Sequence, residues 1–566
     1  MIKQMEIQKN IAAVPARQND RYLLFWRRIF EMIPGLVSWS ILLYVLILAV
    51  VNPIKATIFV ICFYLFWLFR LLYMTILLVA SYVILDQERA ANWFERCEDL
   101  MNLAAATQKV SERLKLSRER LKKMPESEQK INLKHGMKSE ERHLRKLKWL
   151  ADEKMNLLPL RSIYHVVIFP NYHEETSVLI SALDALRETN FPLDRLIVVM
   201  AFEEREGKSA REKSEIISKQ FKNMFFHLIS AFHPADLPGE RAVKGANATW
   251  AAKQVNEFLM KEEIPLEQVL VSCFDADTCV GKEYFGCLTY NFLLRTDRLN
   301  CSFQPIPVYH NNVWQAPAFA RMMETSSSYW QLIESANPDH LVTFSSHSMS
   351  FKALVEAGFW PVDMISDDSA IFWRCYLHYK SKYRAVPLFV TLSMNIVVGR
   401  NWWDTFRKLY VQKRRWAWGI ENFPMVMTGF LQDKEIPLTE KIRHGFKMLE
   451  GHVSWATWGL MLTFFGWLPL LLVGREFGHS VVSYHLPRIR EVIFNLAGLS
   501  LLVSIVLSFL ITPKPPKHVS KLRNFSFAFQ WLLPLMLPAL LALPALDAQT
   551  RLLLGRYLNF EVTKKV

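Results

Sequence analysis

Two long apolar stretches near the N-terminus restrict this chain more than any other feature of its sequence. The stretch 33–51 carries no charged residue and is long enough to cross a bilayer. After a turn at Asn52-Pro53, a second stretch at 57–85 is interrupted only by Arg70. The two stretches predict a transmembrane hairpin. The basic residues in segment 1–30 place the N-terminus in the cytosol, so the chain returns there after residue 85.

The composition is typical of a chain that is part membrane protein and part globular domain. Hydrophobic residues make up 51% of the 566 residues, which is high for a soluble protein. A chain of this length is expected to fold as two or more units. The net charge of +15 points to nucleic acid or to an anionic membrane, and its placement decides between them. The seven cysteines form no C-x-x-C pair, which excludes a zinc frame or a disulfide scaffold and suits a reducing compartment.

Three further apolar segments lie near the C-terminus, at 452–473, 492–511 and 525–546. They predict C-terminal transmembrane segments over 451–546, followed by a tail at 547–566. Four basic residues between the last two segments place that loop in the cytosol.

The segment 86–160 is charged and almost free of glycine, which predicts a basic helical cytosolic segment with a break near Pro125. A solvated helix or hairpin explains such a run of charges. Electrostatic contact with the anionic inner leaflet is the functional alternative, because the run directly follows a membrane helix.

Between 161 and 400 strand-like and helix-like patterns alternate, which predicts a doubly wound α/β domain. The candidate strands are 164–169, 196–200, 225–229, 268–274, 300–307, 341–344 and 385–392.

Two carboxylates, Asp275 and Asp277, follow the buried strand predicted at 268–274. The carboxyl end of such a strand is where open α/β sheets bind ligands. Two carboxylates there can share one Mg²⁺ or Mn²⁺, whose remaining ligands are substrate phosphates. A strand-end turn is the structural alternative for the same residues.

The segment 401–450 mixes aromatic and basic residues, which fits amphipathic helices in a membrane interface. Nucleic-acid binding is a poorer explanation, because apolar spans flank the segment. Within it Gln412, Arg415 and Trp416 have i, i+3 and i+4 spacing, so they share one helical face.

Five short motifs occur in a fixed order along this domain. They are FPNYHEE ending at Glu175, KGAN starting at Lys244, DAD at 275–277, SDD ending at Asp368, and QKRRW ending at Trp416. In order and spacing the set resembles the family 2 membrane glycosyltransferases, which include cellulose and hyaluronan synthases. The resemblance covers about 164–418 and the flanking membrane helices.

This resemblance implies a GT-A-like nucleotide-sugar domain inserted between transmembrane helices, in the plasma (inner) membrane with the catalytic domain cytosolic. It implies inverting transfer of a sugar from a nucleotide sugar, UDP-linked by expectation, to a growing polysaccharide, with Mg²⁺ or Mn²⁺ as cofactor. Asp368 would be the general base, and Asp277, assisted by Asp275, would hold the metal. The nucleotide sugar would contact Tyr172, Glu174, Lys244 and Asp275. The acceptor and the diphosphate would contact Asp367, Gln412, Arg415 and Trp416.

Some positions depart from the family pattern. His173 stands where asparagine is usual, and Asp367 replaces the common glutamate. After the second predicted strand, the sequence Phe202-Glu203-Glu204-Arg205 replaces the usual D-D-G-S. Either Glu203 or Glu204 could supply the acidic group that contacts the base of the nucleotide. For Asp367-Asp368 the structural alternative is a cap of the helix that follows.

Other functions remain open at this stage. A single-sugar transfer to a lipid-linked acceptor would use the same motifs. A transporter with a cytosolic domain would need ionisable residues in several spans, whereas Arg70 is the main one found. A metal-dependent phosphoryl or nucleotidyl enzyme would not need Gln412, Arg415 and Trp416 at a membrane interface. The expected partners are a nucleotide sugar, a glycan or lipid-linked acceptor and the bilayer, without nucleic acid.

Two further expectations concern the membrane region and the C-terminus. Arg70 lies near the bilayer midplane, where an arginine is costly, so it is expected to face the helix bundle and meet the acceptor's path or a buried acidic or carbonyl partner. Snorkelling of its side chain to an interface is the structural alternative. The tail 560–566 is similar to the F-x-V-T-x-K-G gating loop of cellulose synthases, which implies a gating role for Thr563 and Lys565. That role needs the proline-rich segment 525–546 to break or return, so that the tail reaches the cytosol.

Overall fold

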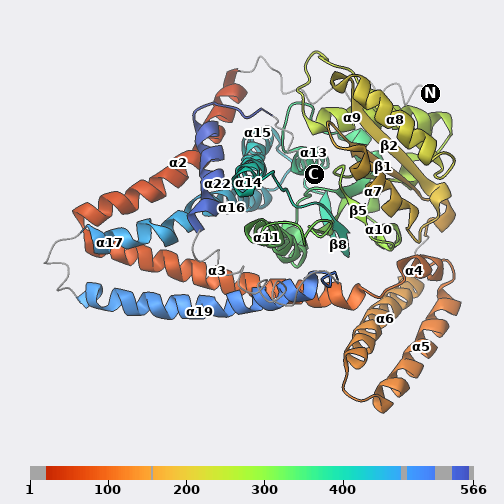
Figure 1. Cartoon of the computed structure of the whole chain (residues 1–566), viewed down its shortest axis with the longest axis horizontal. Coiled ribbons are helices and arrows are strands. Elements are labelled where there is room, and N and C mark those ends of the chain that lie inside the picture. The colour runs from red at the N-terminus through yellow and green to blue at the C-terminus, as the bar shows by residue number, and fades with distance from the viewer. Residues whose placement is uncertain (1–20, 154–156, 473–480, 517–537, 560–566) are drawn as a thin grey trace.

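A mixed eight-stranded sheet lies at the centre of the α/β domain, and long helices extend from one side of it (Figure 1). The computed structural model describes residues 21–153, 157–472, 481–516 and 538–559. The strand order is β3-β2-β1-β4-β7-β6-β8-β5. The strands are β1 Tyr164–Pro170, β2 Leu196–Glu203, β3 His227–His233, β4 Val269–Cys273, β5 Cys279–Val280, β6 Cys301–Val308, β7 His347–Ser350 and β8 Arg384–Ser393.

The first half of the sheet is parallel, and its strands β2 and β4 are fully buried. Strands β3, β2, β1 and β4 run parallel, whereas β7 pairs antiparallel with both β4 and β6. Strands β1, β2 and β4 are apolar runs without alternation, as expected where helices cover both faces. The α/β class predicted from the sequence is therefore confirmed.

Successive residues of β1 point into two different cores. Val167 and Phe169 pack in a core with α7 (Thr176–Arg187), α8 (Lys208–Gln220) and α10 (Tyr284–Leu293). Val166 and Ile168 pack in a second core with α9 (Lys244–Lys261), α12 (Phe351–Glu356) and α13 (Asp367–His378). This two-residue alternation is the ordinary geometry of a strand covered on both sides.

One strand prediction is wrong. Residues 341–344 form no strand, because their polar groups bond to other parts of the chain. The Phe344 N–H donates to the Gln304 side chain, and the Thr343 hydroxyl donates to the Asp368 carbonyl. The strand in this region is β7, whose Ser348 hydroxyl lies 2.6 Å from that of Ser272 on β4. β7 is polar, so it lacks the apolar pattern that predicts a strand. The two-residue strand β5 also went unpredicted, and β3 begins two residues after the predicted start.

Three helices are long and apolar enough to cross a membrane within the described residues: Arg21–Val51, Pro53–Glu88 and Pro487–Ile511. They belong to α2 (Arg21–Val51), α3 (Pro53–Glu88) and α19 (Val481–Ile511). The turn between α2 and α3 follows from its sequence, since the Asn52 side chain accepts the Lys55 N–H and Pro53 begins the next helix.

The predicted span 452–473 is not one helix. Helix α16 runs over Leu438–Thr463, across the boundary predicted at 450, and a 3-10 turn at Phe465–Trp467 precedes the short α17 (Leu468–Leu471). Gly466 lies in this interruption and packs tightly, since a Cβ there would overlap the Tyr64 hydroxyl. Of the predicted span 525–546, residues 525–537 lie outside the described residues, and α22 (Pro538–Leu553) packs beside α2 and α16 (Figure 1).

The charged segment folds as three helices. A short α4 (Trp93–Asp99) is followed by α5 (Leu103–Lys123) and α6 (Glu128–Glu153), which form an antiparallel hairpin beside the end of α3 (Figure 1). The remaining helices of eight residues or more are α11 (Ala318–Ser335), α14 (Trp402–Ala417) and α15 (Asn422–Gln432).

Candidate functional site

A single pocket opens beyond the carboxyl ends of β1, β2 and β4. Every site residue predicted from the sequence that lies in the described part of the chain lines this pocket. They are Tyr172, Glu174, Lys244, Asp275, Asp277, Asp367, Asp368, Gln412, Arg415 and Trp416. Thr563 and Lys565 lie outside the described residues.

Lys244 joins two of the predicted motifs. Its Nζ lies 2.8 Å from Asp275 Oδ1 and 3.1 Å from Asp368 Oδ1. Burial by itself would lower the Lys244 pKa, but the charges of Asp275 and Asp368 outweigh burial and raise it well above its usual value. Lys244 begins α9, and Gly245 lets this helix approach the Asp367 loop, because a Cβ there would lie 2.4 Å from the Pro361 carbonyl oxygen. The ammonium therefore stays charged between the two carboxylates.

Asp367 and Asp368 have different surroundings at the start of α13. Asp367 is 3% exposed, and its Oδ2 is among the buried side-chain atoms of the described residues without a hydrogen-bond partner. Burial, reinforced by the charge of Asp368, raises the Asp367 pKa well above its usual value. Burial therefore disfavours the charged form of Asp367, while Asp368 faces the pocket beside Lys244. Neither side chain caps α13, so the capping alternative is not what the geometry favours.

The D-x-D carboxylates are held in place from the neighbouring loops. Asp277 is 2% exposed, and its Oδ2 accepts the Asn395 N–H at 2.7 Å. Asp275 accepts the Ser345 hydroxyl at 2.6 Å. No group of three or more His, Cys, Asp or Glu side chains suited to a metal occurs in the described residues. Two fixed carboxylates nevertheless fit a hard cation whose remaining ligands come from a substrate diphosphate.

Helix α14 brings the QKRRW motif to the pocket. Gln412 is 2% exposed, and its Oε1 has no hydrogen-bond partner within the described residues. The Trp416 ring packs edge-on against Phe344 at 5.4 Å between ring centroids. Its indole is further held by Lys413, whose Nζ lies 3.7 Å from the ring centroid and 3.0 Å from Glu324 Oε2 on α11.

The other end of the pocket carries an aromatic platform. The Tyr172 ring lies 3.9 Å from the His173 ring and 4.1 Å from the Arg205 guanidinium, measured to the Tyr172 centroid. Arg205 pairs with Glu203 at 3.2 Å, and Glu203 rather than Glu204 lines the pocket. His173 has a φ of 67°, a left-handed conformation that asparagine and histidine both adopt more readily than most residues.

Several residues that organise the site were missed by sequence reasoning. Glu421 accepts the N–H groups of Ile365 and Ser366 at 2.8 and 2.7 Å, and so fixes the loop before Asp367. Tyr309 lines the pocket with its buried hydroxyl unpartnered within the described residues. Glu421 follows the QKRRW motif closely, but no local pattern signals a contact with residue 366.

Comparisons with known proteins describe the fold only. No family model and no curated protein matches the chain. Among similar solved structures is the mannosyltransferase PcManGT from Pyrobaculum calidifontis in complex with GDP-Man and Mn²⁺ (13% identity, TM-score 0.37, covering 81% of this chain and 99% of that one). Another is S. aureus TarS 1-349 in complex with UDP-GlcNAc (13% identity, TM-score 0.34, covering 70% and 94%). Likeness at this level carries no argument about activity.

Arg70 faces the helix bundle, as predicted from the sequence. It forms an ion pair with Glu450 on α16 and lies over the Trp67 ring, with 5.1 Å to the centroid. Its side chain is 19% exposed.

The last described residues lie against the α/β domain. Arg241, three residues before Lys244, donates to the Leu558 carbonyl at 2.8 Å. Arg28 donates to the Leu552 carbonyl at 2.9 Å and ties α22 to α2. The segment that leads into the tail therefore lies on the side of the α/β domain where the pocket opens.

Proposed function

We propose that this protein is a membrane-embedded inverting glycosyltransferase that transfers a sugar from a nucleotide sugar, probed first as a UDP-sugar, to a growing polysaccharide. The observation that carries the proposal is the convergence of the D-x-D carboxylates, Asp368 and the α14 motif on one pocket. Asp367, Gln412 and Tyr309 line this pocket, and each has a buried polar atom without a partner among the described residues. Polar side chains of this kind suit a polyhydroxylated ligand.

Asp368 takes the proton in the proposed reaction. The acceptor hydroxyl attacks the anomeric carbon while its proton passes to a carboxylate oxygen of Asp368. The bond between that carbon and the diphosphate breaks on the opposite face, so one displacement inverts the anomeric centre. Lys244 orients Asp368 through its bonds at 3.1 and 3.2 Å to the two carboxylate oxygens.

The leaving diphosphate would lie beside Asp275, Asp277, Lys244 and Arg415. Asp275 and Asp277 would hold Mg²⁺ or Mn²⁺, and the bound cation would offset the negative charge that develops on the diphosphate. Lys244 and Arg415 place positive charge in the same region. The Trp416 indole offers an apolar platform for the acceptor sugar ring.

The proposal is tested on purified protein in lipid nanodiscs with a panel of nucleotide sugars, with and without Mn²⁺. We expect release of nucleoside diphosphate that depends on the sugar donor and is lost in Asp368→Asn. Mass analysis of the product separates a polysaccharide from a single sugar on a lipid. Hydrolysis of nucleotides without transfer of sugar would contradict the proposal.

A further inference from the structure

The two sides of the α5–α6 hairpin carry their charges differently. On the side toward α4 the cations are paired. Lys109 lies 2.7 Å from Glu95 and 2.9 Å from Asp99, and Arg113 lies 2.7 Å from Glu95. These ion pairs belong to the contact that holds α5 against α4, so their charge is already compensated within the protein.

The other side carries a row of exposed cations on each helix, interrupted by Glu119 on α5 and by Glu141 on α6. Helical spacing places each row on one face, and the ion pair between Arg118 on α5 and Glu141 on α6, at 2.8 Å, brings the two rows together. All the other cations of these rows are exposed, and none has an acidic partner within ion-pair distance in the described residues. This basic face consists of Lys115, Lys122, Lys134, Lys138, Arg145 and Lys148.

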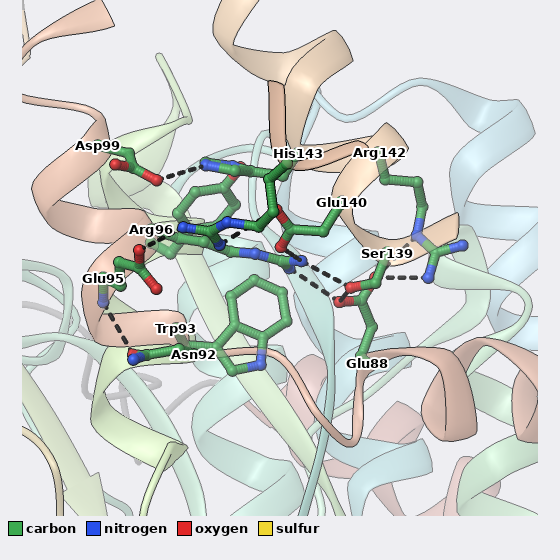
Figure 2. Close-up of polar contacts among 12 residues, drawn as sticks. Glu88, Asn92, Trp93, Glu95, Arg96, Asp99, Ser139, Glu140, Arg142 and His143 are labelled. Atoms are coloured by element: carbon green, nitrogen blue, oxygen red, sulfur yellow. Dashed lines mark hydrogen bonds and ion pairs between the residues drawn. The ribbon is translucent and has the colours of Figure 1, made fainter. Parts of the chain in front are cut away.

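A buried polar network fixes the hairpin to the end of α3. Figure 2 shows Arg96 between Glu88, at the last turn of α3, and Ser139 of α6, with hydrogen bonds of 2.9 and 2.7 Å. Arg142 donates to the other Glu88 oxygen at 2.7 Å. Arg96 is 4% exposed and Glu88 is 6% exposed. Breaking one partner of such a buried pair leaves an uncompensated charge, so the attachment is rigid.

The attachment point lies directly after the apolar part of α3. The apolar stretch ends at residue 85, and Asp86, which contacts His135 of α6 at 2.6 Å, is the next residue. Glu88 lies about 5 Å along the helix axis from residue 85, where the apolar stretch ends. Lys134 and Lys138 neighbour His135 in α6, so the basic face begins at the level where α3 leaves its apolar environment.

We propose that the basic face binds the anionic headgroups of the membrane leaflet from which α3 emerges. Clusters of four to eight lysines and arginines next to a membrane helix are attracted to anionic lipids over about one Debye length. With Arg118 the face carries seven cations against two acids, Glu119 and Glu141, so it keeps a net positive charge that attracts anionic headgroups. The inference needs α3 to span a membrane and does not depend on sugar transfer.

Lysine acylation on the full-length protein tests the proposal. The protein is placed in nanodiscs of phosphatidylcholine alone or with about 30 mol% phosphatidylglycerol, and the acylation rate of each lysine is measured by mass spectrometry. We expect the lysines of the basic face to react about threefold more slowly in the anionic nanodiscs. Salt at about 0.5 M should remove the difference, because it shortens the Debye length. Lys208 and Lys219, exposed on α8, serve as internal controls with unchanged rates.

A variant that removes four cations of the basic face completes the test. In Lys134→Gln/Lys138→Gln/Arg145→Gln/Lys148→Gln, we expect Lys115 and Lys122 to lose their lipid-dependent slowing. A matched variant replaces four exposed lysines of α8, α9 and the α8–β3 loop: Lys208→Gln/Lys219→Gln/Lys222→Gln/Lys261→Gln. In this variant Lys115 and Lys122 should keep their lipid-dependent slowing. Equal rates in both nanodiscs would overturn the proposal and point to an acidic protein partner. Slowing in both nanodiscs that salt does not reverse would also overturn it.

Discussion

Asp275 and Asp368 accept hydrogen bonds from the same Lys244 ammonium, at 2.8 and 3.1 Å, although they come from a strand end and a helix start far apart in the chain. This shared cation links the proposed metal-binding carboxylates to the proposed general base. It holds the two negative charges close together without a ligand, since the repulsion between them is offset by a buried positive charge. The two acids nevertheless have separate roles in the proposed reaction, and mutation should separate them.

Replacing the two acids should affect different steps. Asp277→Ala should weaken metal-dependent donor binding, because one of the two carboxylates for the cation is lost. Asp368→Asn should leave donor binding nearly intact and lower turnover about 100-fold or more, the scale of a lost general base. Calorimetric donor titrations and single-turnover rates measure the two effects. Near-normal turnover in Asp368→Asn would show that another group takes the proton.

The ion pair between Lys413 and Glu324 should stabilise the fold and position Trp416. Their side chains are 8% and 0% exposed, so Lys413→Met leaves an unpaired buried carboxylate and should cost about 3–5 kcal/mol. Loss of the cation beneath the indole should also raise the acceptor KM more than the donor KM. Thermal unfolding in detergent and steady-state kinetics measure these changes.

Two controls accompany this prediction. The double variant Lys413→Met/Glu324→Met should recover much of the lost stability, because no charge remains buried. Arg187→Gln breaks an exposed pair with Asp184 and should change stability by less than about 1 kcal/mol. Equal effects of Lys413→Met and Arg187→Gln would contradict the prediction.

Arg70 and Glu450 should depend on each other within the helix bundle. Arg70→Leu leaves Glu450 without its cation between α3 and α16, and we expect a measurable loss of stability, because the two side chains are only 19% and 26% exposed. Arg70→Leu/Glu450→Leu should be more stable than either single variant. The fraction of monodisperse protein after heating measures the order of stability. Lys55→Leu, at the exposed start of α3, should resemble the wild type, and additive single effects would argue against the pair.

His165 should make the α/β domain sensitive to acid. Burial between Phe191 and Phe285 lowers its pKa to about 3 from the usual value near 6.5. Between these values the unfolded chain binds a proton that the folded chain does not. The His165 contribution is therefore fully present above pH 6.5 and is lost toward pH 3, at about 1.4 kcal/mol per pH unit. His165→Gln should lack this loss, so the difference in unfolding free energy between wild type and variant should shrink or reverse as the pH falls from 7 to 5. A difference that stays constant with pH would show that His165 titrates normally.

The end of α22 should lie on the same side of the membrane as the pocket. Leu558 contacts Arg241 of the α/β domain, so a cysteine at Arg556 should react from the side on which Lys219→Cys reacts. The test uses sealed vesicles, an impermeant thiol reagent and a background without the exposed Cys62 and the half-buried Cys279. Labelling of the two positions from opposite sides would exclude a gating role for Thr563 and Lys565.

Local pattern predicted most of the strands and helices and the residue types proposed for the site. The apolar runs of β1, β2 and β4 and the uncharged helices α2 and α3 are visible in the sequence because burial on all sides requires them. The motifs around Asp275, Lys244, Asp368 and Trp416 were found by their order, and the strand-end position of the first predicted where ligands would bind.

Contacts between distant segments decided the rest. No periodicity indicates that Lys244 reaches both Asp275 and Asp368, or that Glu324 of α11 holds Lys413. The apolar segment 341–344 was predicted as a strand but forms none, whereas the polar segment β7 does form a strand. Hydrogen-bond partners from other strands and loops decide both outcomes. The sequence determined which apolar runs must be buried, since that depends on each side chain's own affinity for water. The tertiary structure decided which charged side chains form pairs, because a buried ion is stable only beside the partner that the fold brings to it.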